Sequence, residues 1–347
     1  MKKEYIIPIF VPHRGCPNDC TFCNQKKISG ETKIVTADDV KSTIEYYLKN
    51  FKQKDKYVEV AFFGGSFTGI ETDKQEELLS AAYEFILTKK VDSIRISTRP
   101  DYISKDTLKR LKRYGVKTIE LGVQSTNNYV LEKAKRGHTF EDVVNASKLI
   151  RKHGFTLGHQ MMIGLPESTR ADEIKTAKDL IKLKPKIVRI YPVLVINGTE
   201  LEESYRSGAY EPLNVEQAVE VSKDLLALFN KKKIKVIRVG LQNTNEITDP
   251  NNKNSQVVAG PYHPAFRQLV ESALWYDNIA EKIKSLNMKV KKIKVEVNSS
   301  DINNVVGHKK SNIKKIKDTY GIDASVKVNN RIKCGKFKII IVNQAVN

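Results

Sequence analysis

The feature that most limits the fold is the alternation of short β-rich runs with helical stretches from residue 5 to about residue 240. Such alternation predicts parallel strands joined by crossover helices, because two parallel neighbours need a connection long enough to return to the same end of the sheet. Several of the runs are apolar on both faces, as strands buried in a parallel sheet are. The strand-like runs are 5–11, 57–63, 92–98, 117–123, 155–163 and 186–193, with 236–240 as a possible seventh.

Helical stretches fit between these runs. Thr36 and Asp39 form a capping-box pattern, and Gly115 and Gly154 stand where helices should end. We therefore expect an α/β fold in which residues 1–242 form a partial or complete parallel β/α barrel, like a TIM barrel. An open doubly wound sheet is the alternative, because periodicity does not distinguish it from a barrel.

Two further regions follow the expected barrel. Residues 243–264 are rich in Asn, Pro and Gly and predict a long loop, and 265–286 predict a helix, so 243–286 form a connection that packs on the barrel. Residues 287–347 predict a basic strand, two short helices around Gly307, and strands near 323–328 and 336–342. The order β-α-α-β-β predicts a small α+β domain.

The chain is strongly basic. It has 60 Lys and Arg against 40 Asp and Glu in 347 residues, and residues 285–347 alone hold 14 against 4. This excess favours a polyanionic partner, nucleic acid before membrane, although a solvated basic surface is the alternative. No run approaches the roughly 20 apolar residues of a membrane span, and the first apolar stretch lacks a cleavage-like end. We therefore expect a cytoplasmic protein.

Three of the four cysteines lie within eight residues of each other, in a loop directly after the first strand. The loop is 12–25, and its cysteines are Cys16, Cys20 and Cys23. Such spacing suits a metal site better than a disulfide framework, and thiolates are the usual ligands of iron–sulfur clusters. Three ligands leave one iron of a [4Fe–4S] cubane open, since Cys334 is far away in the sequence. A structural zinc site with His13 as fourth ligand is the alternative.

The CxxxCxxC loop after the first strand resembles that of the radical S-adenosylmethionine (SAM) superfamily. The resemblance implies that SAM chelates the open iron and is cleaved by one electron to methionine and a 5′-deoxyadenosyl radical. It also implies a low-potential electron donor such as flavodoxin or ferredoxin. The glycine pair after the second strand, Gly64 and Gly65 with Ser66, matches the superfamily's contact with the SAM amino group.

Other motifs stand at the carboxyl ends of successive strands, which meet at one mouth of a β/α barrel. By the resemblance, Ser97 and Gln124 lie near the ribose or methionine part of SAM, and residues around Met162 and Gly164 lie near the adenine. No residue is assigned a catalytic role. The full set expected to contact SAM is Phe22, Gly64, Gly65, Ser66, Ser97, Gln124, Met162 and Gly164.

A narrower resemblance covers roughly residues 5–270. The matching motifs are 97–102, 119–125, 135–139, 158–166 and 191–210. Together they resemble the catalytic subunit of the Elongator complex and its bacterial relatives, and more distantly the oxygen-independent coproporphyrinogen oxidases. Elongator acts on the wobble uridine of tRNA, beginning with a radical at C5. We find no acetyltransferase module after the barrel, so carboxymethylation by that route is not expected. His138, His159 and Tyr191 stand beside these motifs, either as polar groups of the pocket or as packing residues.

Residues 302–328 resemble a KH RNA-binding domain, in which a GxxG loop between two helices clamps the nucleotide backbone. Here a lysine replaces the second glycine of that loop. A basic helix on a purely structural domain is the alternative. The residues expected to contact RNA are Gly307, His308, Lys309, Lys310, Lys314 and Lys315.

Together these features predict a radical SAM enzyme that modifies an RNA base, with tRNA and its wobble uridine as the expected substrate. The target base must be unpaired or flipped, because a base inside a helix does not reach such a pocket. Two alternatives stay open. One is a radical SAM enzyme for a small-molecule or porphyrin-like substrate, and the other is a nonenzymatic iron–sulfur protein that binds RNA.

Overall fold

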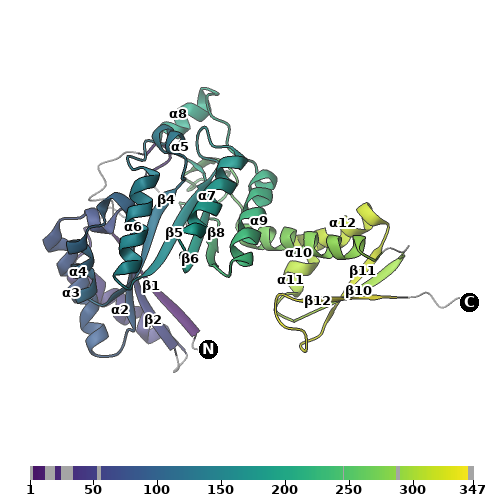
Figure 1. Ribbon diagram of the computed structural model, residues 1–347, viewed down its shortest axis with the longest axis horizontal. Helices are drawn as coiled ribbons and strands as arrows, with labels where there is room; N and C mark the ends of the chain where they lie inside the picture. The colour runs from purple at the N-terminus through teal and green to yellow at the C-terminus, as the bar shows by residue number, and fades with distance from the viewer. Residues whose placement is uncertain are drawn as a thin grey trace, which may run out of the picture. The chain divides into compact units, whose positions relative to one another are not determined.

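A computed structural model describes residues 3–11, 20–24, 34–52, 56–244, 246–286 and 290–342 of the chain (Figure 1). Internal contacts divide the chain into two units, Met1–Ala218 with Leu228–Tyr262 and Val219–Ala227 with His263–Asn347. The division expected from the sequence, with boundaries after residues 242 and 286, stays a proposal. No helix among the described residues combines the length and the apolar character that crossing a membrane requires.

The first unit is built on a seven-stranded parallel sheet whose strands follow the chain order (Figure 1). All seven strand-like runs of the sequence are strands in the structure. They are β1 (Lys3–Val11), β2 (Lys56–Gly64), β3 (Ser93–Thr98), β4 (Val116–Gln124), β5 (Thr156–Ile163), β6 (Ile187–Pro192) and β8 (Lys235–Val239).

The order of the strands decides between the two expected folds. A doubly wound sheet reverses its strand order at a switch point, whereas here each strand lies next to its successor in the chain and every crossover therefore runs the same way. Strands β1 and β8 form the two edges of the sheet. Glu4 of β1 nevertheless pairs with Lys235 of β8 at 3.0 Å, so the sheet curves until its edges approach at the amino ends of the strands. The fold is a partial parallel barrel.

Helices pack along the outer face of this sheet (Figure 1). Four of the helices, α2, α6, α7 and α9, begin with a complete capping box, which satisfies two free backbone N–H groups. The helices of this region are α2 (Ala37–Asn50), α3 (Thr72–Leu87), α4 (Lys105–Arg113), α5 (Asn128–Lys133), α6 (Phe140–Lys152), α7 (Arg170–Lys182) and α8 (Glu200–Arg206), with 3₁₀ turns η1 (Phe67–Gly69) and η2 (Pro100–Tyr102). Helix α9 (Val215–Lys231) has residues in both units.

The segment expected to be a long loop contains a short strand. Strand β9 (Val257–Ala259) pairs antiparallel with β7 (Val195–Ile196), and Ile247 and Val257 are buried against Leu194 and Ile196. The loop expected over 243–264 is therefore wrong in part. Two or three residues of pairing are too few to produce a periodic pattern in the sequence, and it is tertiary packing that stabilises them.

The second unit contains a three-stranded sheet of order β11-β10-β12, in which β11 is parallel and β12 antiparallel to β10. One face of the sheet and three helices enclose an apolar core that includes Ile279, Val295 and Ile316. Its elements follow the β-α-α-β-β order expected from the sequence. They are α10 (Phe266–Lys284), β10 (Lys292–Val297), α11 (Ile302–Val306), η3 (His308–Lys310), α12 (Ser311–Tyr320), β11 (Asp323–Val328) and β12 (Phe337–Ile341).

Candidate functional site

The carboxyl ends of the parallel strands gather most of the expected site residues at one edge of the barrel. The loop after β1 is described only at residues 20–24, so Cys16 lies outside the described residues. Cys20 is buried and Cys23 is half-buried, and the Cys23 N–H donates to the Cys20 carbonyl at 2.9 Å. This turn brings two of the three expected cluster ligands together.

Cys20 lies beside a buried cation. Arg136 Nη1 is 3.5 Å from Cys20 Sγ, and Nη2 of the same guanidinium donates to the Gly122 carbonyl at the end of β4 at 2.9 Å. The backbone of Thr21 is held in turn by the carbonyl of Ala134 and the N–H of Leu201. A guanidinium against a thiol that becomes negative when it binds metal suits Cys20 for an iron–sulfur ligand.

Arg136 also connects two sequence motifs that are 37 residues apart. Arg99, which is 2% exposed, donates from Nη1 to the Arg136 carbonyl at 2.6 Å and from Nη2 to Asp101 at 2.8 Å. His138 is buried next to them, and its Nε2 lies 3.2 Å from the Val123 carbonyl. Burial, followed by the charges of Arg136 and Arg99, lowers the pKa of His138 to about 3. His138 is therefore neutral, and its buried Nδ1 has no hydrogen-bond partner among the described residues.

The glycine pair after β2 makes a close backbone approach. Gly64 has a φ of +114°, and a Cβ there would lie 2.2 Å from the Val11 carbonyl oxygen at the end of β1. Only glycine fits this position. Three residues expected to contact SAM, Gly65, Ser66 and Ser97, line one narrow pocket with Val11.

Gln124 ends β4 in the left-handed backbone region, with a φ of +68°. Its side-chain oxygen is buried without a hydrogen-bond partner among the described residues, as is Nε of Arg136. Buried polar atoms are seldom left unpaired, so these two atoms fit a site that is completed by a bound group. Together with the cysteine pair and the glycine cradle, they suit a cluster with SAM beside it.

The remaining expected SAM contacts fall into two places. Phe22 and Met162 pack against the same apolar cluster, which includes Val130 and Leu165.

Gly164 has a φ of +76°, and side chains bind both its N–H and its carbonyl. Its N–H donates to Glu173 Oε1 at 2.6 Å, and its carbonyl accepts from the Tyr210 hydroxyl at 2.6 Å. Burial raises the pKa of Glu173 to about 7. Neither Glu173 nor Tyr210 was predicted from the sequence as a site residue.

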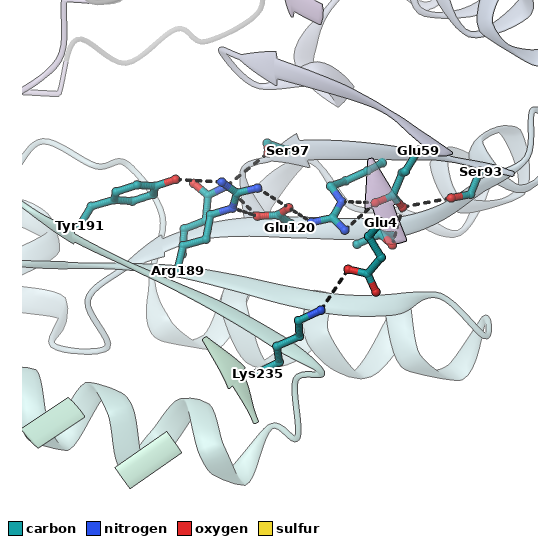
Figure 2. Close-up of polar contacts among 11 residues, drawn as sticks. Glu4, Glu59, Ser93, Ser97, Glu120, Arg189, Tyr191 and Lys235 are labelled. Carbon is teal, nitrogen blue, oxygen red and sulfur yellow. Dashed lines mark hydrogen bonds and ion pairs between the residues drawn. The ribbon is translucent and has the colours of Figure 1, made fainter. Parts of the chain in front are cut away.

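A buried ion network crosses the inner face of the sheet below the mouth (Figure 2). Arg95 of β3 bonds Glu59 of β2 at 2.7 Å and Glu120 of β4 at 2.8 Å, and Arg189 of β6 bonds Glu120 at 3.1 Å. Burial alone would raise the pKa of Glu120, but Arg189 and Arg95 outweigh it and hold this pKa below its usual value. Burial likewise opposes the charge of Arg189, yet Tyr191 and Glu120 raise its pKa. The inner face is therefore lined by fixed charges of both signs.

This network was not among the predictions from the sequence, although a signal for it was present. Each of the four charged residues stands directly between two hydrophobic residues of a strand, and a parallel strand rarely buries a charge without a partner. They are Glu59, Arg95, Glu120 and Arg189. His159 lies on the other face, where its Nε2 is 2.9 Å from Ser147 Oγ of α6. Because it points away from the inner face, His159 is a packing residue and not a pocket group.

In the second unit, the expected RNA-binding loop is a tight left-handed turn. Gly307, Lys309 and Lys310 have φ values of +79°, +51° and +62°, so Lys310 takes a backbone conformation that favours glycine. His308 stands edge-on to His263 of the same unit, with ring centroids 5.7 Å apart. The buried Asn312 holds the turn by donating to three backbone carbonyls.

The lysines of this unit differ in whether another side chain already engages their ammonium group. Lys315 Nζ lies 4.2 Å from the centre of the Tyr276 ring, and Lys317 pairs with Asp323 at 2.9 Å. Lys309, Lys310 and Lys314 are exposed and have no ion pair among the described residues.

Cys334 is also exposed, and its Sγ is 3.3 Å from Asp301 Oδ1. The described residues contain no group of three or more His, Cys, Asp or Glu side chains that could hold a metal ion.

Comparisons with known proteins agree with this geometry. Residues 10–180 match the radical SAM superfamily model, and residues 185–276 match the Radical_SAM C-terminal domain model. An uncharacterized protein of Methanocaldococcus jannaschii is 32% identical over 236 residues, which cover 65% of this chain and 72% of that protein.

Named relatives match over a shorter length. The tRNA uridine(34) acetyltransferase of Methanocaldococcus jannaschii is 40% identical over 129 residues, 36% of this chain and 24% of that protein. The Methanocaldococcus infernus protein of the same name is matched over 34% of its length, so this chain spans a quarter to a third of these relatives.

Among solved structures, the archaeal Methanocaldococcus infernus Elp3 with an N-terminal deletion superposes with a TM-score of 0.62 at 22% identity. The superposition covers 84% of this chain and 66% of that one, and it shows the likeness of the fold. The mouth of the barrel brings together a cysteine turn, a glycine cradle and unpaired buried atoms. The sequence matches and this site point to the same family. The chain belongs to the radical SAM superfamily, whose members use a [4Fe–4S] cluster and SAM.

Proposed function

We propose that this radical SAM enzyme modifies an unpaired base of RNA, with tRNA as the substrate and its wobble uridine as the target. The observation that carries the proposal is the match of the radical SAM part to proteins named tRNA uridine(34) acetyltransferase. That match covers about a quarter to a third of those proteins, so it supports the substrate class and not the acetyl transfer in their name. The alternative substrates, a small molecule or a porphyrin, have no comparable support.

The site supplies the parts that such a reaction needs. When bound, the cluster and SAM provide a 5′-deoxyadenosyl radical for a base carbon that acid–base chemistry does not activate. Cys16, Cys20 and Cys23 are the proposed ligands of the cluster. The residues proposed to hold SAM are the eight expected from the sequence, Phe22, Gly64, Gly65, Ser66, Ser97, Gln124, Met162 and Gly164. A low-potential donor such as flavodoxin or ferredoxin is the proposed source of the electron.

The second unit is proposed to hold the RNA as a KH-like domain. Its turn at Gly307 lies between two helices, as a GxxG loop does, and Lys309, Lys310 and Lys314 are available for phosphates. Lys315 and Lys317 are weaker candidates because an aromatic ring and a carboxylate already engage them. His308 of the same turn completes the proposed contact surface.

Anaerobic reconstitution with iron and sulfide, followed by reduction in the presence of SAM, tests this proposal. The 5′-deoxyadenosine formed is measured with and without bulk tRNA, and Cys20→Ala is the control that should abolish it. We expect tRNA to accelerate SAM cleavage and Lys309→Glu to weaken that acceleration. Cleavage that ignores tRNA would favour a small-molecule substrate, and a cluster that never cleaves SAM would favour the nonenzymatic RNA-binding alternative.

A further inference from the structure

Two side chains on the inner face of the barrel present hydrogen-bonding atoms that the protein does not use. Tyr191 is the second-last residue of β6, and its phenol oxygen accepts a hydrogen bond from Arg189 Nη1 at 3.3 Å (Figure 2). Its own proton therefore points elsewhere. Gln160 of β5 donates from Nε2 to Ser97 Oγ at 3.2 Å and to Glu120 Oε2 at 3.4 Å, which leaves its Oε1 free. Neither the Tyr191 proton nor Gln160 Oε1 has a partner among the described residues.

The chemistry of the network determines how these groups are oriented. Glu120 is ionised and only accepts hydrogen bonds, so the amide nitrogen of Gln160 must face it and the amide oxygen must face away. Arg189 only donates, so the Tyr191 oxygen must accept from it and must donate its proton to something else. The structure therefore fixes Gln160 as an acceptor and Tyr191 as a donor toward any molecule that enters the barrel.

Ser97 adds a third group to the same row. Its Oγ accepts from Gln160, and its proton is free to donate. A continuous chain of hydrogen bonds joins Ser97, Gln160, Glu120, Arg189 and Tyr191 across β3 to β6, so the three groups belong to one rigid array. Along the sheet the array reads donor, acceptor, donor.

The network holds this array firmly. Arg189 binds Glu120 through Nε and Nη2, and its guanidinium lies 5.1 Å from the centre of the Phe63 ring on β2. Tyr191 is paired in register with Met162, two residues closer to the mouth than the pair of Gln160 with Arg189. The array therefore faces the end of the barrel where SAM is proposed to bind.

We propose that Ser97, Gln160 and Tyr191 form a base-recognition array that binds the imide edge of an unpaired uracil. An imide edge reads acceptor, donor, acceptor, through two ring carbonyls that flank N3–H, and this order is the complement of the order donor, acceptor, donor along the array. Cytosine, adenine and guanine each present a different order on this edge. Ser97 then stands between the base and SAM. The inference rests on the proposed function and specifies how its substrate base is chosen.

The reconstituted holoenzyme tests this array with RNA stem–loops whose loops contain only uridine, only N3-methyluridine or only cytidine. N3-methyluridine has the size of uridine plus one methyl group, but it lacks the proton that Gln160 would accept. The readout is the ratio of RNA-dependent 5′-deoxyadenosine formation between uridine and N3-methyluridine. We expect uridine to be preferred by about tenfold or more, the effect of leaving one buried acceptor unpaired.

Variants then assign the preference to the array. Tyr191→Phe and Gln160→Leu should each reduce the preference for uridine over cytidine about tenfold, and Gln160→Leu should also close the gap to N3-methyluridine. Tyr46→Phe removes the hydroxyl of an exposed tyrosine on α2 and should match the wild type. Tyr191→Phe deletes a single oxygen, so it decides the question even where Gln160→Leu does not fold.

The outcomes separate this inference from the proposed function. A wild-type enzyme that responds equally to uridine and N3-methyluridine would overturn the array while leaving tRNA as a substrate. Variants that keep the full preference for uridine would also overturn it. A wild-type enzyme that no RNA stimulates would overturn the proposed function and the array together.

Discussion

Replacing Glu120 by glutamine measures how much the inner network stabilises the barrel. Glu120 is 1% exposed and receives hydrogen bonds from Arg95 and Arg189, both of which are mostly buried. Glutamine keeps the size but removes the negative charge, so Arg95 keeps Glu59 as its counterion and Arg189 is left without a carboxylate partner among the described residues. Removing one partner of a buried ion pair costs about 3–5 kcal/mol, because the other charge stays buried. We therefore expect Glu120→Gln to lower the melting temperature by on the order of 10 °C.

Urea unfolding at neutral pH, followed by circular dichroism, gives the free energy of unfolding for each variant. The matched control is Glu4→Gln, which removes the same charge from the exposed pair with Lys235 and should cost less than about 1 kcal/mol. The double variant Glu120→Gln with Arg189→Met should recover part of the loss, because it removes a cation that has lost its partner. A Glu120→Gln protein within about 1 kcal/mol of the wild type would refute this reasoning.

The pH dependence gives an independent check on the same residue. The folded state lowers the pKa of Glu120, so its contribution is present above the unfolded pKa of about 4.3 and is lost as the pH falls through the folded pKa. The difference in unfolding free energy between the wild type and Glu120→Gln should therefore shrink as the pH falls below about 4. A difference that is constant down to low pH would point to packing rather than charge.

Three further predictions follow from other parts of the chain. Gly64→Ala should abolish SAM cleavage, because its Cβ would lie 2.2 Å from a carbonyl oxygen, whereas Gly154→Ala, with nothing within 4 Å, should cost about 1 kcal/mol of stability and keep activity. The raised pKa of Glu173, about 7, means that the folded protein keeps a proton that the unfolded chain loses near pH 4. The unfolding free energy should then fall by up to about 3 kcal/mol as the pH rises from about 4 to 7, and Glu173→Gln should flatten this slope. In a plot of log RNA affinity against log salt concentration, Lys309→Ala should make the slope shallower by about 0.7 to 0.9. Lys317→Ala should change the slope less, because the Lys317 ammonium is already paired with Asp323.

Much of the barrel could be read from the sequence because its signals are local. Each β-rich run became a strand, and the caps at Thr36 and Asp39 formed as their spacing predicts. The short strand β9 could not be read, because two or three paired residues leave no periodic pattern and depend on a partner some 60 residues earlier. The candidate site was anticipated where a residue type carries its own chemistry, as Cys20 and Gly64 do.

The sequence by itself determined the parallel α/β plan, the cysteine spacing and the glycine positions, because spacing and backbone freedom are properties of a short segment. Only the tertiary structure decided which charges meet. Glu59 and Arg189 are 130 residues apart in the chain, yet they belong to one network, because neighbouring strands in a curved sheet bring the same inner face together. The tertiary structure also decides which atoms of Gln160 and Tyr191 are left without a hydrogen-bond partner, because this depends on the side chains that lie beside them.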